Sequence, residues 1–169
     1  MTKQTTLLYW YLPCEQDERR LQKVIDGLAD TQGAPSFRPH LTLGASSDIE
    51  EPLRLGASML KAVTLTPIEI DGNEVFTTSL FMRFGLNDAL TQARMALQQQ
   101  PSFRQGRAFD PHMSLCYGPP PKGAHAQEDV RALLSNPVRF DRLATVSVEL
   151  PVNSYYGVRA WRVLNVISV

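Results

Sequence analysis

The chain contains the sequence PHLTLG at residues 39–44, and a similar sequence, PHMSLCYG, recurs at residues 111–118. Both begin with proline, histidine, an aliphatic residue, a hydroxyl residue and leucine. The chain has three histidines, and two of them, His40 and His112, occupy these stretches. They lie a little under half the chain length apart, so the repeat predicts two similar halves that pack face to face.

Each stretch has the pattern of a β-strand, in which residues i and i+2 point to one face. His40 and Thr42 therefore share a face, as do His112 and Ser114, while the aliphatic residues between them point the other way. We expect the aliphatic faces to enter a core. The imidazoles and hydroxyls would then line a cleft where the two halves meet.

Two imidazoles in one cleft suit general acid–base catalysis. Their ordinary pKa of about 6.5 lets one ring be neutral while the other is charged near pH 7. One ring would take a proton from a water that attacks phosphorus, and the other would protonate the departing sugar oxygen. The hydroxyls of Thr42 and Ser114 would donate to the nonbridging oxygens. Hydrolysis of a strained phosphodiester fits this set, with no metal and no other cofactor.

The same residue types also occur in structural and metal-binding roles. A lone histidine on a strand is usually structural, and a lone hydroxyl residue reflects β propensity, so the recurrence of the pair favours function. Zinc normally takes three or four protein ligands, and the His and Cys spacing shows no such site. Three scattered cations could neighbour a phosphate, although such residues are usually solvated: Arg83, Arg107 and Lys122.

Hydrophobic patterning predicts about seven or eight strands and four helices, with hairpins among the strands. A turn at residues 71–73 indicates a hairpin between two of the strands, and Pro67 indicates that the first of these is an edge strand. The mixture indicates an α+β fold with antiparallel sheets. The expected strands cover 5–12, 38–44, 63–70, 75–84, 111–118, 138–150 and 157–169, and the expected helices cover 15–29, 48–61, 88–99 and 126–135.

Length and composition indicate one soluble domain over residues 1–169. Lys and Arg total 17, as do Asp and Glu, and this balance argues against long nucleic acid as a partner. The only cysteines, Cys14 and Cys116, exclude a disulfide framework and fit a reducing compartment. The sequence has neither a signal-peptide pattern nor a long apolar run, so we expect a cytoplasmic monomer with no membrane partner.

The paired stretches resemble a known family. Residues 40–43 and 112–115 match the H-x-T/S-hydrophobic pair of the two-histidine phosphoesterases. Residues 110–118, DPHMSLCYG, look like the second motif of the cyclic phosphodiesterase branch known from plants and yeast. Residues 9–13, YWYLP, resemble the first strand of that branch. The resemblance covers nearly the whole chain in length and element order.

The resemblance implies a bilobal α+β fold. Two antiparallel sheets related by pseudo-two-fold symmetry would face a central cleft, with helices on the outside. It implies opening of a small-molecule nucleotide cyclic phosphate to a monophosphate, the substrate being a nucleoside 2′,3′-cyclic phosphate or ADP-ribose 1″,2″-cyclic phosphate. By the same resemblance His112 would be the base and His40 the acid, although the sequence itself does not decide between them.

The resemblance also assigns the substrate-binding residues. Thr42 and Ser114 would bind the phosphate, and Trp10 and Tyr117 would lie along the cleft. Trp10 could stack on a nucleobase, because every base has a π-face, but a strand tryptophan is as often part of a core. Tyr117 would face away from His112 in a regular strand, and a bulge near Gly118 could turn it to the cleft.

Two other functions stay open. One is an RNA-end enzyme of the same superfamily that cuts or joins 2′–5′ linkages or trims 3′ ends, which the neutral net charge disfavours for long RNA. The other is a nucleotide-binding module that keeps the cleft without turnover. The intact histidine and hydroxyl residues in both stretches argue against that module.

Overall fold

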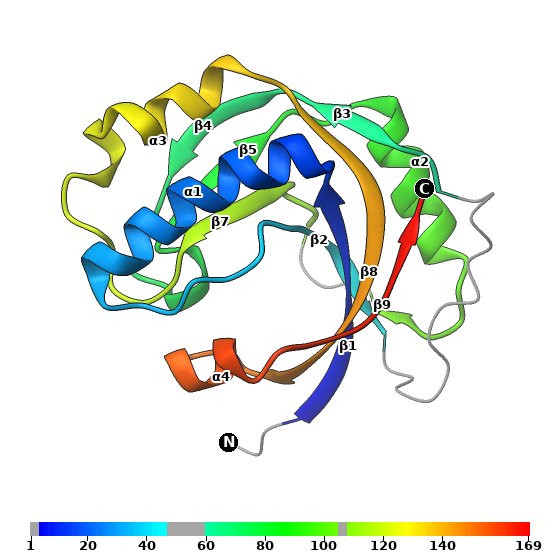
Figure 1. The fold of residues 1–169 in the computed structure, drawn as a ribbon. Coiled ribbons are helices and arrows are strands. Elements are labelled where there is room, and N and C mark those ends of the chain that lie inside the picture. The colour runs from blue at the N-terminus through cyan, green and yellow to red at the C-terminus, as the bar shows by residue number, and fades with distance from the viewer. Residues whose placement is uncertain (1–3, 47–59, 105–107) are drawn as a thin grey trace.

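The structure is a computed structural model that describes residues 4–46, 60–104 and 108–169. These residues form two antiparallel sheets with helices on their outer sides (Figure 1), which confirms the α+β class expected from the sequence. The helix expected at 48–61 lies almost wholly outside the described residues.

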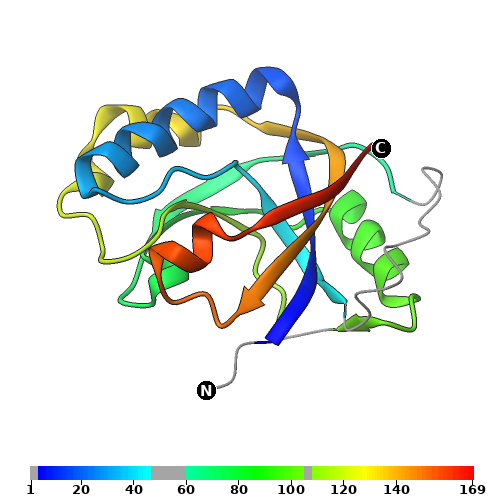
Figure 2. The same cartoon turned by 60° about the horizontal axis from the view of Figure 1, so that its bottom comes forward.

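Sheet A has six strands in the order β3-β8-β1-β2-β6, with β9 paired to β8. The long strands β1 and β8 pair along their whole length and curve across the molecule (Figure 1). Figure 2 shows β9 running along β8 after a short helix, α4. The strands are Gln4–Pro13 (β1), Leu41–Ser46 (β2), Val63–Leu65 (β3), Phe103–Arg104 (β6), Val138–Leu150 (β8) and Arg162–Ser168 (β9).

Sheet B has three strands, Pro67–Asp71 (β4), Leu80–Phe84 (β5) and His112–Cys116 (β7), in the order β4-β5-β7. The expected hairpin is confirmed in the pairing of β4 with β5, and β4 lies at the edge of the sheet as Pro67 predicts. The single strand expected at 63–70 is wrong, because β3 joins sheet A and β4 joins sheet B. Proline lacks the N–H that would continue a ladder, so the change of sheet falls at this residue.

The longest helix, α1, spans Glu15–Gln32 and ends at Gly33, whose φ of 61° is the left-handed conformation that glycine favours. Helix α2 spans Asp88–Gln98, and the Asn87 side chain caps it by accepting a 2.9 Å hydrogen bond from the Leu90 N–H. The shorter helices are Glu128–Ala132 (α3), Tyr155–Arg159 (α4) and the 3-10 turns Phe76–Thr78 (η1), Ala124–Ala126 (η2) and Leu133–Ser135 (η3).

Two expected strands are therefore shorter than the sequence pattern suggested. Helix α4 occupies the start of the strand expected at 157–169, and η1 occupies the start of the one expected at 75–84. Helix α4 is only about one turn long, and it is stabilised by the Ser154 cap and by the buried side chain of Val158. Such a short segment leaves no periodic signal in the sequence.

The main core lies beneath α1, which packs against β7 and β1. Its buried stripe is the one predicted from helical spacing and comprises Leu21, Val24, Ile25 and Leu28. The aliphatic residues of both histidine strands enter the same core, and all are at most 1% exposed: Leu41, Leu43, Met113 and Leu115. Burial of such side chains stabilises the fold by about 1.5–3 kcal/mol each, so the core fixes which face of each strand looks outward.

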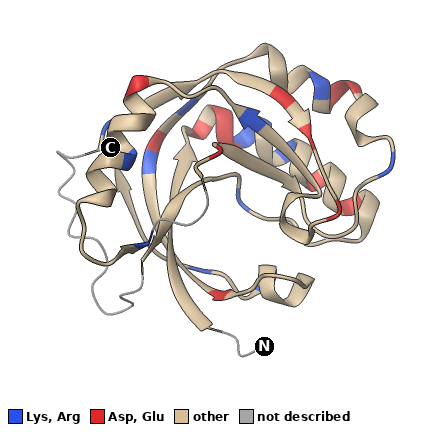
Figure 3. Cartoon of the chain, turned by 180° about the vertical axis from the view of Figure 1, so that it is seen from behind, with Lys and Arg blue, Asp and Glu red and all other residues tan. Residues whose placement is uncertain are grey.

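Basic and acidic residues are interspersed along the helices and strands (Figure 3), in keeping with the net charge of zero. Within the described residues, no helix is both long enough and apolar enough to cross a bilayer.

Candidate active site

A cleft of about 920 Å³ lies between the sheets. Its walls come from β1 and β2 of sheet A, β7 of sheet B, the η1 turn and the segment that follows β8. All the site residues expected from the sequence line this one cleft, namely Trp10, His40, Thr42, His112, Ser114 and Tyr117. The alternation predicted for the two histidine strands is therefore present in the structure, while the role of each residue stays a prediction.

Both imidazoles are held in the same way by the backbone. Nδ1 of His40 lies 2.7 Å from the carbonyl oxygen of Arg38, and Nδ1 of His112 lies 2.8 Å from the carbonyl oxygen of Asp110. A carbonyl oxygen can only accept, so each Nδ1 carries the proton and donates it. Each ring therefore leaves Nε2 for a ligand in the cleft.

The residues that supply these carbonyls are themselves anchored by ion pairs. Arg38 donates to Glu18 on α1, with Nε 2.6 Å from Oε1. Asp110 accepts from Arg83 on β5, with Nε 3.0 Å from Oδ1. The residue two before the histidine is the cation in the first pair, Arg38, and the anion in the second, Asp110. In both cases the ion pair connects the segment before the histidine to a neighbouring helix or strand.

His40 is the more enclosed ring. It is 6% exposed and stacks on Trp10, with ring centroids 3.6 Å apart and planes 13° apart. Burial lowers the pKa of His40 to about 4, the Arg38 carbonyl opposes this shift, and the neighbouring charge of His112 adds to it. His40 is therefore neutral near pH 7. His112 is only half-buried and lies edge-on to Phe81, with ring centroids 5.3 Å apart.

The two hydroxyl residues differ in their hydrogen bonds. Ser114 Oγ is 2.9 Å from the carbonyl oxygen of Thr77 and donates to it, and the side chain is 7% exposed. Thr42 is half-buried, and its hydroxyl has no hydrogen-bond partner among the described residues. Thr42 can therefore donate to a phosphate oxygen directly, whereas Ser114 must first release Thr77.

Three aromatic side chains pack together beside His40 and form what we call the aromatic wall: Phe37, Tyr117 and Trp161. Tyr117 follows the end of β7 and reaches the cleft because the strand stops at Cys116, before Gly118 with its φ of 105°. Its ring packs on Phe37 with centroids 4.3 Å apart. Burial raises the pKa of the Tyr117 hydroxyl, although a hydrogen bond with Ser114 opposes this shift, so that hydroxyl keeps its proton.

Trp161 belongs to this wall, although no sequence pattern predicted it there. Its ring lies edge-on to Trp10, His40 and Tyr117, at centroid distances of 5.3, 5.8 and 5.4 Å. Trp161 lies between α4 and β9, and no sequence motif surrounds it. It reaches the cleft because β9, which follows it, pairs with β8.

The cleft contains no strong fixed charge. Among the described residues that line it there is no Lys, Arg, Asp or Glu. Of the cations noted in the sequence, Lys122 is exposed in a loop outside the cleft, and Arg107 lies outside the described residues. The described parts of the chain also hold no group of three His, Cys, Asp or Glu side chains arranged to bind a metal ion.

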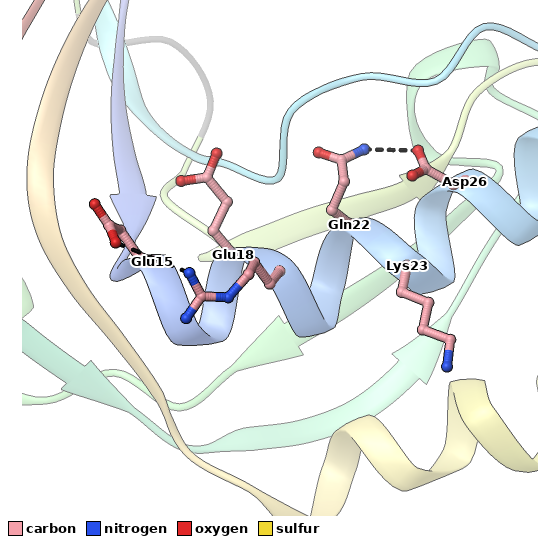
Figure 4. Close-up of a pocket in the computed structure, with 6 residues that line it drawn as sticks. Glu15, Glu18, Gln22, Lys23 and Asp26 are labelled. Carbon is pink, nitrogen blue, oxygen red and sulfur yellow. Dashed lines mark hydrogen bonds and ion pairs between the residues drawn. The ribbon is translucent and has the colours of Figure 1, made fainter.

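A second hollow, of about 500 Å³, lies along one side of α1 (Figure 4). Its polar side chains are largely paired with one another or with neighbouring elements. Gln22 donates to Asp26 at 2.8 Å, Arg19 lies 3.9 Å from Glu15, and Glu18 is bound by Arg38 and Arg142. We assign this hollow no chemistry.

No protein-family model and no curated protein sequence matches the chain. Its fold, however, matches crystal structures of E. coli LigT. LigT complexed with phosphate aligns over 99% of both chains with a TM-score of 0.54 and 13% identity. LigT complexed with 3′-AMP aligns over 98% of both chains with a TM-score of 0.53 and 15% identity.

The chain has the LigT fold. LigT is a two-histidine phosphoesterase, so the resemblance noted in the two motifs extends to the fold of nearly the whole chain. The sheets of this LigT-like fold are unequal, with six and three strands. The internal symmetry expected from the repeat is closest around His40 and His112, where the same backbone contact recurs.

Proposed function

We propose that the protein is a two-histidine phosphodiesterase that opens small nucleotide cyclic phosphates to monophosphates without a metal ion. The observation that carries this proposal is the pair of imidazoles in one cleft, each with Nδ1 held by the carbonyl of the residue two before it. The LigT fold supports it, as do the phosphate and 3′-AMP with which LigT is complexed.

The reaction needs one proton acceptor and one proton donor. Because His40 is neutral near pH 7, we assign it as the base whose Nε2 takes a proton from the attacking water. His112, the more exposed ring, is then assigned as the acid that passes a proton to the departing sugar oxygen. One P–O bond forms and one breaks, and the two rings exchange protonation states.

This assignment is the reverse of the one implied by the family resemblance, and it can be tested. An analogue with sulfur in place of the leaving oxygen needs little protonation as it departs. We expect His112→Ala to lose much less activity on this analogue than on the oxygen substrate, and His40→Ala to lose similar activity on both. The opposite pattern would restore His112 as the base.

The polar groups of the cleft suit a small substrate. Thr42, and Ser114 after rotation, can donate to the nonbridging oxygens, while the aromatic wall offers apolar surface to a base or sugar. The described residues that line the cleft include no Lys or Arg, so they offer no cationic track of the kind by which proteins follow a long phosphate backbone. These features favour a mononucleotide over long RNA.

Phosphorus NMR on a panel of cyclic phosphates in the presence of EDTA tests the proposal as a whole. The panel contains nucleoside 2′,3′-cyclic phosphates, ADP-ribose 1″,2″-cyclic phosphate and a short 2′–5′-linked oligonucleotide. We expect monophosphate products from the cyclic nucleotides, and at least about 100-fold lower kcat in His40→Ala and in His112→Ala. Full activity in either variant, or activity abolished by EDTA, would refute the mechanism.

A further inference from the structure

A side pocket of about 510 Å³ opens from the cleft beside His112. The side pocket and the cleft share Thr42, Val75, Thr77 and His112, so the two hollows are continuous along the catalytic face. The side pocket differs in having cations in its lining, which are Arg83 and Arg94.

Arg83 is already neutralised. It makes ion pairs with Glu69, Asp71 and Asp110. Of these three carboxylates, only Asp110 also lines the side pocket, and it is bound by Arg83 at 3.0 Å. The carboxylates of this group outnumber its one cation, so the group does not attract an anion, and Arg94 is the cation that the described lining of the side pocket offers to one.

Arg94 is different. It lies on α2 and is 7% exposed, yet it has no ion pair or hydrogen bond to any described residue, and its Nε is buried without a partner. Its guanidinium lies over the ring of Phe109, 3.9 Å from the centroid. Burial lowers the pKa of Arg94, which reflects the cost of keeping a charge in this position without a counterion.

The helix pattern makes this placement unusual. Leu90, Ala93 and Leu97 form the buried stripe of α2, and Arg94 takes the position of that stripe where an apolar residue would be expected. Buried cations are normally paired. A buried guanidinium that has no ion pair among the described residues and lines a pocket continuous with the active cleft therefore indicates an anionic ligand.

We propose that the side pocket binds a second phosphate of the substrate, with Arg94 as its cationic partner, so that preferred substrates are nucleoside 2′,3′-cyclic phosphates that carry a 5′-phosphate. The inference rests on the proposed function. The cyclic phosphate occupies the space between the histidines, the base faces the aromatic wall, and the 5′-phosphate enters the side pocket. A planar guanidinium suits this task because it can donate two parallel hydrogen bonds to a phosphate.

Paired substrates test the proposal. Adenosine 2′,3′-cyclic phosphate is compared with the same compound carrying a 5′-phosphate. We expect the wild-type protein to favour the 5′-phosphorylated form by at least about 10-fold in kcat/KM, and Arg94→Met to lose most of this preference. Arg94→Lys should keep part of it, because the charge remains without the bidentate geometry. Arg19→Met, which removes an exposed arginine on α1, serves as the control and should keep the full preference.

A binding experiment separates failure of this inference from failure of the proposed function. Calorimetry compares adenosine 3′-monophosphate with adenosine 3′,5′-bisphosphate, and needs no turnover. Tighter binding of the bisphosphate by at least about 10-fold, lost in Arg94→Met, supports the site even if neither cyclic compound is hydrolysed. Equal binding of the two ligands by wild-type protein, or equal hydrolysis of the two substrates, overturns the inference while leaving the proposed function intact. Because both comparisons use wild-type protein, they stand even if an Arg94 variant fails to fold.

Discussion

The rings of Trp10 and His40 stack almost parallel, with centroids 3.6 Å apart. One face of the indole is therefore covered by the imidazole and is not open to a nucleobase. Trp10 is 2% exposed and packs with Leu12, Ala144, Val146 and Val148 of sheet A. It acts as a rigid support that sets the plane of His40, and we class it as a positioning residue.

This relationship predicts the effect of replacing Trp10. Aromatic contacts of this kind contribute about 0.5–1.5 kcal/mol beyond burial, so Trp10→Leu should lower kcat about 10-fold, and Trp10→Phe should lower it less. Since burial is the main cause of the low pKa of His40, Trp10→Leu should also move the acidic limb of the kcat/KM profile to higher pH. A rise in KM alone, with no change in that limb, would instead identify Trp10 as a base-stacking platform.

The ion pairs of Glu18 predict a second effect. Glu18 lies 2.6 Å from Arg38 and 2.6 Å from Arg142, and all three side chains are mostly buried. Glu18→Gln leaves two cations short of a partner and should lower the free energy of unfolding by about 1–2 kcal/mol. It should also loosen the carbonyl that holds His40 and lower kcat. Chemical denaturation and kinetics measure the two effects.

Glu15 offers a matched control on the same helix. Its pair with Arg19 spans 3.9 Å, and both side chains are exposed, so Glu15→Gln should change neither stability nor activity. A Glu18→Gln protein that behaved like Glu15→Gln would show that α1 does not help to position His40.

The burial of His40 predicts how stability depends on pH. The folded state disfavours the imidazolium, so between pH 6.5 and pH 4 the unfolded chain binds more protons. The free energy of unfolding should therefore fall as the pH drops through this window, by up to about 3 kcal/mol, and this loss should be complete below pH 4. Denaturant titrations at several pH values measure it.

His40→Gln removes the titrating group and should flatten the curve between pH 6.5 and pH 4. The ion-paired carboxylates leave only the upper part of this window clear, above about pH 5. Burial opposes the shift of Glu18, but the hydrogen bonds from Arg38 and Arg142 keep its pKa below the ordinary value of 4.5, so its contribution begins to be lost near that value and the wild-type and His40→Gln proteins are compared above it. An unchanged slope in His40→Gln would show that His40 does not titrate as the structure indicates.

The two hydroxyl residues should respond differently to removal. Thr42→Val deletes a hydroxyl that has no hydrogen-bond partner in the described part of the chain, and it should reduce kcat/KM about 10-fold with little change in stability. Ser114→Ala leaves the carbonyl of Thr77 without its donor, so it should also cost about 1 kcal/mol of stability. Thermal unfolding and kinetics of both variants test this contrast, and equal stability losses would contradict it.

Much of the active cleft could be predicted from the sequence because its key signal is local. The alternation of histidine, aliphatic and hydroxyl residues sets which side of each strand enters the core, and the core then directs His40 and His112 to the same cleft. Helix α1 was predictable for the same reason, because its buried apolar residues from Leu21 to Leu28 follow regular helical spacing.

The remaining features depend on contacts between distant segments. The apolar alternation of residues 63–70 changes parity at Pro67, but this change alone does not show that β3 and β4 belong to different sheets. Trp161 reaches the cleft through the pairing of β9 with β8, which no local pattern encodes. Arg94 did leave a signal, a charged residue in the apolar stripe of α2, but its meaning emerges only once the helix is seen beside the cleft.

If His40 and His112 act as proposed, their backbone contacts limit how reactive the protein can be. A peptide carbonyl orients an imidazole but, unlike the carboxylate of a serine-protease triad, brings no negative charge to make the ring more basic. Such a pair of imidazoles is therefore neither a strong base nor a strong acid. It needs a substrate that is already activated, as a five-membered cyclic phosphate is. Ordinary linear phosphodiesters should pass through the cleft uncut, which would let the protein work among intact nucleic acids without damaging them.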